Sequence, residues 1–211
     1  MLNDCLLFIF DLDGTLYSKD REKNYYRELQ KLRKRFIAKT LGVPLKEADR
    51  ILAGLISNYG ENIDITLETE YGVPKPRYYA ETAGSVPVED IISYDPKLRC
   101  ILCQIDSTKS VLTNAPSVWA EKAIGQLGIA DQFGLVMTCD DGIVKPQEEA
   151  FLRVCRGAAV EPKRAIAVGD NPQRDLYVPR KLGMKTVSVG VFDTNADFFI
   201  DSIYGLPEIL R

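Results

Sequence analysis

An apolar run near the N-terminus ends abruptly in two acids. Residues 6–10 are Leu-Leu-Phe-Ile-Phe, followed by Asp11 and, one residue later, Asp13. A short continuous apolar run is typical of a strand covered on both faces, as in a parallel sheet flanked by helices. If the extended backbone persists to Asp13, both carboxylates point the same way and can converge before a turn at Gly14. The pattern fits a ligand site at a strand end, and it also fits a simple Asx turn beside a glycine.

The pattern changes after Tyr17. Residues 18–94 are rich in polar positions, and apolar residues recur at helical spacing, for example in 29–37 and in 48–56, which predicts a helical insertion. Beyond it, short β-rich runs alternate with helical patterns. We expect further strands at 110–113, 135–138, 165–168 and 186–189. Repetition of strand, helix and strand implies right-handed crossovers and a parallel sheet.

Bulk composition excludes several classes of protein. The 211 residues are 45% hydrophobic and 27% charged, which is typical of a globular protein with a sizeable core. A net charge of −3 gives no electrostatic footprint for nucleic acid or an anionic membrane. No apolar run approaches the roughly 20 residues that cross a bilayer, and the N-terminus lacks a signal-like pattern. We therefore expect a cytoplasmic protein, monomer or homodimer, with no nucleic-acid or membrane partner.

The five cysteines are odd in number and scattered, which argues against a disulfide framework. Cys100 and Cys103 form a CxxC inside the helical pattern of residues 96–105, with no second CxxC to complete a zinc site. We expect both to pack in the core rather than to carry redox or metal chemistry.

Histidine is entirely absent from the chain. Its absence removes the commonest general base, the commonest transition-metal ligand and any Ser-His-Asp triad. The chemistry therefore has to depend on carboxylates, lysine, hydroxyls and hard metal ions.

Polar residues also come after two of the later strands. Thr113 and Asn114 come after the run at 111–112, where free backbone N–H groups at the start of a helix can hold a phosphate oxygen. Asp170 and Asp175 come after the run at 166–168 and can complete the oxygen shell of a cation. Taken singly, each pair also fits ordinary helix capping.

The order of these motifs closely resembles that of the haloacid dehalogenase (HAD) superfamily. The resemblance covers the whole chain, including a helical cap inserted just after the first strand. It implies a Rossmann-like α/β core with a parallel sheet, formed by residues 1–17 and 95–211, and a helical cap at residues 18–94. The matching segments, in sequence order, are Asp11-Leu12-Asp13-Gly14-Thr15, Thr113-Asn114, Lys145-Pro146, and Gly169-Asp170 with Asp175.

The resemblance also implies a role for each acid. Asp11 would be the nucleophile that forms an aspartyl-phosphate, and Asp13 would protonate the leaving oxygen and then activate water. A Mg²⁺ ion would be held by Asp11, the backbone carbonyl of Asp13, and Asp170. Asp175 would support the metal through water or orient Lys145.

The remaining motif residues would act on the phosphate. By the same resemblance, Lys145 supplies positive charge near the nucleophile, and it counts with the two acids of the first motif among the catalytic residues. Thr113, Asn114 and Gly14 would bind the phosphate. An isolated lysine is otherwise most often solvated surface.

Asp13 and the cap indicate the substrate class. Dehalogenases of the superfamily lack this second aspartate, so its presence favours phosphoryl transfer. The resemblance therefore implies hydrolysis of a small-molecule phosphate ester. Within the superfamily the chain looks most like the pyrimidine 5′-nucleotidase-like group, which favours a nucleoside 5′-monophosphate. A sugar-phosphate or phosphoglycolate phosphatase is the alternative, and a non-catalytic phosphate-binding regulator is the alternative from another class. The likeness to the nucleotidase group depends on Leu16-Tyr17, Tyr59-Gly60, Thr66-Leu67, Tyr71-Gly72, Asp95-Pro96-Lys97-Leu98, Thr113-Asn114 and Leu127-Gly128-Ile129.

Four residues of the predicted cap can stack on, or hydrogen-bond to, a base or a sugar. Packing within the cap, or plain surface exposure, is the competing interpretation for each. These residues are Tyr25, Asn58, Tyr59 and Arg77.

Overall fold

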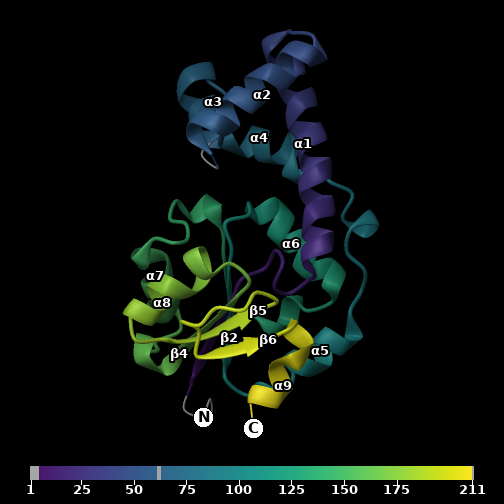
Figure 1. The fold of residues 1–211 in the computed structure, drawn as a ribbon. Helices are drawn as coiled ribbons and strands as arrows, with labels where there is room; N and C mark the ends of the chain where they lie inside the picture. The colour runs from purple at the N-terminus through teal and green to yellow at the C-terminus, as the bar shows by residue number, and fades with distance from the viewer. Residues whose placement is uncertain (1–4, 61–62, 211) are drawn as a thin grey trace. The chain divides into compact units, whose positions relative to one another are not determined.

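The computed structural model describes residues 5–60 and 63–210. The chain forms two compact units, which we call the core unit (Met1–Glu22 with Val88–Arg211) and the insertion (Lys23–Pro87). The core unit contains β1 (Leu7–Phe10), α5 (Pro96–Leu102), β2 (Thr108–Leu112), α6 (Ser117–Leu127), β3 (Leu135–Met137), α7 (Glu148–Gly157), β4 (Ala165–Gly169), η7 (Pro172–Leu176), α8 (Tyr177–Lys181), β5 (Lys185–Val189), β6 (Phe198–Ile200) and α9 (Leu206–Ile209) (Figure 1). The insertion contains most of α1 (Lys19–Leu41), then α2 (Leu45–Tyr59), α3 (Ile63–Tyr71) and α4 (Lys75–Glu81).

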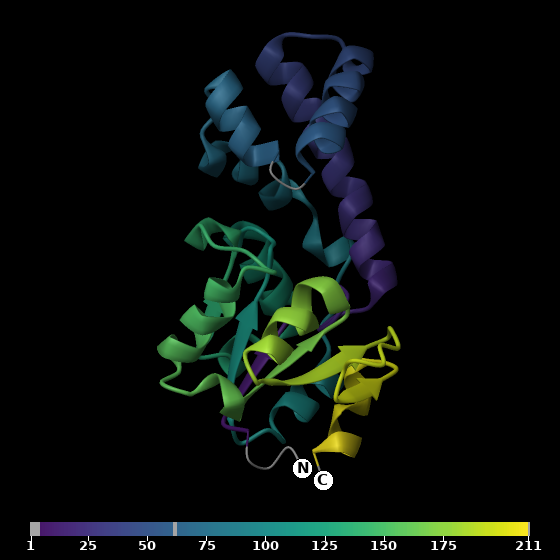
Figure 2. The same cartoon turned by 60° about the vertical axis from the view of Figure 1, so that its left-hand side comes forward.

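The core unit is built on a parallel sheet in the order β3-β2-β1-β4-β5-β6. This confirms the predicted α/β class. Helices α7 and α8 cover one face of the sheet, and α5 and α6 cover the other (Figures 1 and 2). Because β1 lies between β2 and β4, every residue of this strand is buried.

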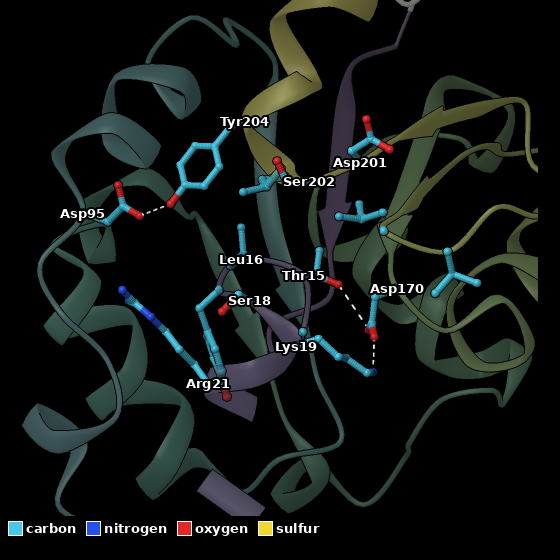
Figure 3. A pocket seen from close by; sticks show the side chains of 16 residues that line it. Thr15, Leu16, Ser18, Lys19, Arg21, Asp95, Asp170, Asp201, Ser202 and Tyr204 are labelled. Carbon is cyan, nitrogen blue, oxygen red and sulfur yellow. Dashed lines mark hydrogen bonds and ion pairs between the residues drawn. The ribbon is translucent and has the colours of Figure 1, made fainter. Parts of the chain in front are cut away.

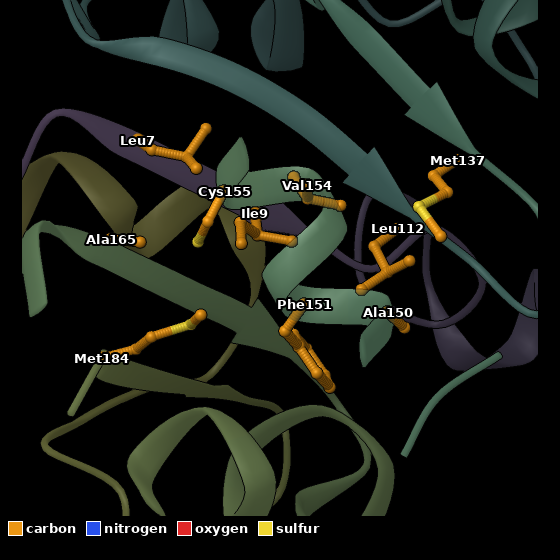
Figure 4. Close-up of a cluster of buried hydrophobic side chains, with 10 residues drawn as sticks. All are labelled: Leu7, Ile9, Leu112, Met137, Ala150, Phe151, Val154, Cys155, Ala165 and Met184. Carbon is orange, nitrogen blue, oxygen red and sulfur yellow. The ribbon is translucent and has the colours of Figure 1, made fainter. Parts of the chain in front are cut away.

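Side chains of β1 anchor both faces of the sheet. Leu7 and Ile9 pack against α7, where Phe151 and Cys155 belong to the same buried cluster (Figure 4). Burying one such aliphatic or aromatic side chain contributes about 1.5–3 kcal/mol. The alternate residues Phe8 and Phe10 are also buried, with ring centroids 6.0 Å apart. The strand is therefore held from both sides, and its C-terminal end rigidly supports the two acids of the first motif.

The insertion has a hydrophobic core of its own. Phe36 and Ile37 of α1 pack with Leu52 and Leu55 of α2, as the helical spacing predicts. Helices α3 and α4 complete this cluster with side chains such as Leu67 and Tyr78. The boundary between the two units falls inside α1, after Glu22.

The two cysteines of the CxxC correct one expectation. Helix α5 forms where it was predicted, but Cys100 and Cys103 are both exposed. Leu98, Ile101 and Leu102 occupy the buried stripe, at the i, i+3 and i+4 spacing of a helix. Core packing of these cysteines was therefore a wrong prediction. Among residues 5–60 and 63–210, no helix is long and apolar enough to cross a bilayer.

Candidate active site

The chain makes a single helical turn directly after β1. The backbone N–H of Leu16 donates to the carbonyl of Leu12 at 3.0 Å. A helical turn brings residues four apart together. The Thr15 hydroxyl accordingly donates to Asp11 Oδ2 at 3.2 Å. In the same way the Tyr17 hydroxyl donates to Oδ1 of the second acid, Asp13.

Gly14 makes this turn possible in two ways. Its φ of +85° lies in the left-handed region that glycine adopts without strain. A Cβ atom at this position would lie 2.8 Å from Asp170 Oδ2. The structure places the Cα of Gly14 against Asp170, which follows β4, and binding of the phosphate by this glycine stays a prediction.

Strand β4 delivers the second pair of acids. β1 and β4 are adjacent parallel strands in register, so Asp11 and Asp170 leave the same edge of the sheet. Asp175 lies in the short π-helix η7, where its Oδ2 accepts from the Asn171 N–H at 3.0 Å. A Cβ on Gly169 would lie 2.3 Å from Asp175 Cβ, so the glycine gives this acid its space. Oxygens of the three acids lie within 4.8 Å of one another.

Lys145 bridges two of these acids. Its Nζ lies 2.6 Å from Asp11 Oδ1 and 2.6 Å from Asp175 Oδ1, and the lysine is only 5% exposed. Burial alone lowers the pKa of an ammonium group, but the two carboxylates outweigh it and raise the pKa of Lys145 above its usual value. The bridge therefore holds a permanent positive charge beside the first acid.

Asn114 supports the backbone of Lys145. Its amide nitrogen donates to the Lys145 carbonyl at 2.9 Å, and its amide oxygen accepts from the Lys145 N–H at 2.8 Å. Both ends of this side chain are thus engaged with the lysine backbone, and its role in binding the phosphate stays a prediction. Thr113 lies at the end of β2 with its hydroxyl 3.5 Å from Asp13 Oδ2.

The environment of Asp13 favours its protonated form. Burial and the nearby charge of Asp11 raise the pKa of Asp13 to about 6, although hydrogen bonds from Tyr17 and Trp119 act in the opposite direction. Burial likewise raises the pKa of Asp175 to about 6, against the attraction of Lys145. A carboxyl with a pKa near neutrality can both give and take a proton.

The residues present fit a divalent metal ion. Even with Asp13 and Asp175 both protonated, three carboxylates in this group remain against two ammonium groups, which leaves negative charge for a cation to balance. The donor set consists of carboxylate oxygens, the ligands that Mg²⁺ prefers. The group, counted among the described residues, comprises the carboxyls of Asp11, Asp13, Asp170, Asp175 and Glu22 and the ammonium groups of Lys145 and Lys19.

Lys19 and Glu22 are members of this site that were not predicted from the sequence. Lys19 Nζ contacts Asp170 Oδ2 and lies 2.9 Å from Glu22 Oε2. Burial lowers the pKa of Lys19, but the two acids outweigh it and raise the pKa above its usual value. Both residues belong to the first turn of α1, and their helical i,i+3 spacing was the available signal.

A cavity of about 260 Å³ opens beside these residues in the core unit. Figure 3 shows Lys19 and Asp170 on one side of it, Arg21 below, and Tyr204 with Asp95 on the other side. The Tyr204 hydroxyl donates to Asp95. The cavity places solvent-accessible space next to the acid-rich edge of the sheet.

The predicted cap residues differ in their surroundings. Tyr25 is buried at 2% exposure, as packing within the molecule requires. Arg77 pairs with Glu81 at 2.9 Å and lies over the ring of Phe36. Tyr59 is 40% exposed, with its hydroxyl 3.1 Å from a glutamate of α3, and Asn58 is exposed.

The parallel sheet and the acid-rich edge place the chain among α/β hydrolases that depend on carboxylates. The sequence model of the haloacid dehalogenase-like hydrolases matches residues 6–183, and the chain belongs to that family. It is therefore an enzyme.

Several curated proteins resemble the chain. It is 26% identical over 220 residues to the glyceraldehyde 3-phosphate phosphatase of Methanocaldococcus jannaschii, and the match covers 96% of each chain. A 96-residue stretch is 35% identical to the N-acetylmuramic acid 6-phosphate phosphatase of Pseudomonas aeruginosa, covering 44% of this chain and 42% of that protein. Among solved structures, a HAD phosphatase from Thermococcus onnurineus shares the fold, with a TM-score of 0.68, 24% identity and 97% coverage of both chains.

Proposed function

We propose that this enzyme hydrolyses a small phosphate monoester through an aspartyl-phosphate on Asp11. The proposal rests on one observation: two acids one residue apart have different electrostatic environments. Asp11 is ion-paired to Lys145 at 2.6 Å, so a positive charge lies beside the attacking group. Asp13 has a raised pKa, which makes this carboxyl able to hold and donate a proton near neutral pH. Two acids with such divided roles are what nucleophilic and acid catalysis at one centre require.

The reaction has two balanced steps. In the first, an oxygen of Asp11 attacks phosphorus, the bond from phosphorus to the ester oxygen breaks, and that oxygen takes the proton of Asp13 and leaves as an alcohol. In the second, water attacks phosphorus and gives a proton to the Asp13 carboxylate. The bond to Asp11 then breaks, so inorganic phosphate leaves and both acids return to their starting forms.

Other residues of the site prepare these steps. Lys145 offsets the repulsion between the Asp11 carboxylate and an incoming phosphate dianion. Asp11, Asp170 and Asp175 offer the oxygens that would hold Mg²⁺. Mg²⁺, when bound, would neutralise charge on the phosphate oxygens.

We favour a small sugar phosphate as the substrate. The relatives that match along 96% of the chain are glyceraldehyde 3-phosphate phosphatases, which supports the sugar-phosphate alternative. A nucleoside 5′-monophosphate is the second candidate, supported by the likeness of the cap segments to the nucleotidase group. A phosphate-binding regulator is disfavoured, because the described residues include the nucleophile, the acid and the lysine. A cytoplasmic location stays a prediction.

The test is a panel of phosphate esters assayed with Mg²⁺, with Asp11→Asn as the matched isosteric variant. We expect the wild type to release phosphate and the variant to lose at least about a thousandfold in kcat/KM, because an amide cannot attack phosphorus. Rapid acid quenching should trap the wild-type protein in its phosphorylated form, whereas the quenched variant should carry no phosphate. Equal turnover by the two proteins would refute the mechanism.

The same panel ranks the substrates. We expect kcat/KM for a triose phosphate to exceed that for a pyrimidine nucleoside monophosphate and for 2-phosphoglycolate. The reverse order would move the assignment to the nucleotidase group. Tight binding of beryllium fluoride without turnover of any ester would instead favour the regulator.

A further inference from the structure

We infer that Tyr17 and Trp119 are positioning residues that fix the carboxyl of Asp13, so that its Oδ2 holds the proton given to the leaving group. The inference rests on the proposed function, since it assigns the support of the acid in that reaction. Neither residue belongs to the four superfamily motifs of this sequence, although Leu16-Tyr17 is one of the segments that resemble the nucleotidase group. Both lie among the donors that reach the carboxyl of Asp13.

Both positioning residues donate to the same oxygen. The Tyr17 hydroxyl donates to Asp13 Oδ1, and the Trp119 indole N–H donates to that atom at 2.9 Å. The indole nitrogen is also 3.3 Å from the Tyr17 hydroxyl oxygen, so the three groups form a closed triangle. An oxygen that accepts from an O–H and an N–H is a poor place for a further proton.

The proton is therefore left to Oδ2, which faces the other way. Oδ2 accepts a long hydrogen bond from the Thr113 hydroxyl at 3.5 Å, which opposes a proton on this atom less than the two donors oppose one on Oδ1. Thr113 directly follows β2, where the phosphate is expected. The protonated acid thus has one orientation, with its carbonyl oxygen held by two donors and its hydroxyl turned to the ester oxygen. Fixed orientation of a catalytic group accounts for much of its effect on rate.

The local fold explains why these two side chains reach the acid. Tyr17 stands four residues after Asp13, in the helical turn directly after β1. Trp119 lies in the first turn of α6 and is completely buried. A buried tryptophan needs a partner for its N–H, and here the acid is that partner. Packing alone would be served by phenylalanine at residue 17, and at residue 119 it requires the volume of the indole but not its N–H.

The test compares two esters that differ in their need for an acid. An alkyl phosphate such as glycerol phosphate releases a basic alkoxide and depends on the proton of Asp13, whereas p-nitrophenyl phosphate releases a stable phenolate and does not. The measured parameter is kcat/KM. It covers the steps up to and including departure of the leaving group, and it does not include the later hydrolysis of the aspartyl-phosphate. The variants are Tyr17→Phe and Trp119→Phe, each of which keeps an aromatic ring and removes one donor.

We expect each variant to lose about 10- to 100-fold in kcat/KM on glycerol phosphate, less than the roughly 10²–10⁴-fold that a general acid contributes, because the acid itself is still present. The loss in kcat/KM on p-nitrophenyl phosphate should be smaller than about threefold, because its leaving group does not need the proton of Asp13. Tyr78→Phe is the matched control, because it removes a buried hydroxyl within the core of the insertion. It should leave the ratio of the two esters unchanged.

Each outcome bears on one proposal. A wild type that hydrolyses neither these two esters nor any ester of the panel refutes the proposed function. An active wild type whose two variants lose equally on both esters, or on neither, refutes the positioning role alone. A merely structural role predicts the equal loss, because disordered packing harms both substrates.

A second measurement requires no turnover. Trp119 is the single tryptophan of the sequence, so intrinsic fluorescence reports on this side chain alone. At pH 8, above the pKa of about 6 for Asp13, the wild type carries a carboxylate beside the indole nitrogen. We expect the emission maximum of Asp13→Asn to lie at shorter wavelength than that of the wild type at this pH, because the negative charge stabilises the excited state. Asp131→Asn, at an exposed ion pair, should leave the emission unchanged. An unshifted Asp13→Asn spectrum would contradict the contact.

Discussion

The core unit and the insertion use charged side chains in opposite ways. At the edge of the sheet, Lys145 and its two partners have side chains that are 4–10% exposed. In the insertion, the pair between Lys39 and Glu81 has side chains that are 70% and 33% exposed. The distances are similar, at 2.6 and 2.9 Å, so distance does not distinguish the two pairs.

Solvent makes the difference between the two regions. Water and salt screen an exposed pair, which contributes at most about 1 kcal/mol. A buried pair costs desolvation and gives little net stability, yet losing one partner costs about 3–5 kcal/mol, because an uncompensated charge stays behind. On the proposed mechanism, the buried charges at the sheet edge serve the chemistry, whereas the charges in the insertion lie on a hydrated surface.

Lys145→Met should give the largest effect. Removing the ammonium group leaves Asp11 and Asp175 facing each other without a counter-ion. We expect the free energy of unfolding of the metal-free protein to fall by about 3–5 kcal/mol. We expect kcat/KM to fall by about 10²–10³-fold, as when one stabilising donor is removed. Urea denaturation and ester hydrolysis measure the two effects, and an unchanged stability would contradict the buried bridge.

Gly14→Ala should give the next effect, through geometry instead of charge. The new Cβ would meet Asp170 Oδ2 at 2.8 Å, at a backbone φ of +85°. We expect a loss of about 1–3 kcal/mol in stability and a weaker binding of Mg²⁺ in calorimetric titration.

Gly183→Ala is the matched control for this substitution. Its φ of +81° imposes the same strain, but its Cβ would meet no atom within 4 Å. Mg²⁺ binding should therefore stay unchanged in this variant. Equal loss of Mg²⁺ affinity in both variants would mean that strain, and not the contact with Asp170, is responsible.

The pH dependence of stability should give a smaller effect. The pKa of Asp13 is about 6 in the folded protein against 3.8 for the ordinary group, so the native state binds more protons than the unfolded state between these values. Stability is then highest at low pH and declines as pH rises through 6. From pH 5 to pH 8 this single group should remove about 1.4 kcal/mol from the free energy of unfolding.

The measurement is urea denaturation in the presence of EDTA, at pH 5 and pH 8. The pKa of Asp175 is raised to about 6 as well, so its contribution has the same sign. Asp13→Asn should show a decline that is smaller by the contribution of Asp13. A decline of equal size in wild type and variant would contradict the raised pKa.

Lys39→Met should give the smallest effect. Its partner Glu81 also pairs with Arg77, and the lysine side chain is 70% exposed. We expect the free energy of unfolding to change by less than about 1 kcal/mol. The value of kcat/KM should stay at that of the wild type. A loss comparable with that of Lys145→Met would overturn the comparison between the two regions.

Much of the sheet could be predicted, because continuous apolar runs report burial on both faces. The first strand was expected at 6–10 and is Leu7–Phe10, and the strand expected at 165–168 is Ala165–Gly169. Strand β2 begins two residues earlier than expected, because Thr108 and Lys109 pair with β1 although they are not apolar. Strand β6 was missed, since three residues at the edge of a sheet carry almost no periodic signal.

The part of the site that could be predicted consists of residues that directly follow the buried strands. Asp11 and Asp170 each come directly after a buried parallel strand, and adjacent strands bring their ends together. Tyr17 was predictable in principle from its i+4 spacing to Asp13. Trp119 was not, because it reaches the acid from a distant helix, and no local pattern distinguishes its N–H from that of any buried tryptophan.

The paired hydrogen bonds between the Asn114 amide and the Lys145 backbone have a consequence for how this part of the chain can vary. The segment from Met137 at the end of β3 to Lys145 is irregular apart from one short turn at Cys139–Asp141. Because the amide pins the lysine itself, insertions or deletions in the middle of this segment need not displace the ammonium group. We expect changes of loop length here to be tolerated in engineered chimaeras, provided that the asparagine is retained together with Asp140 and Asp141, which are hydrogen-bonded to Ser117 and Thr138.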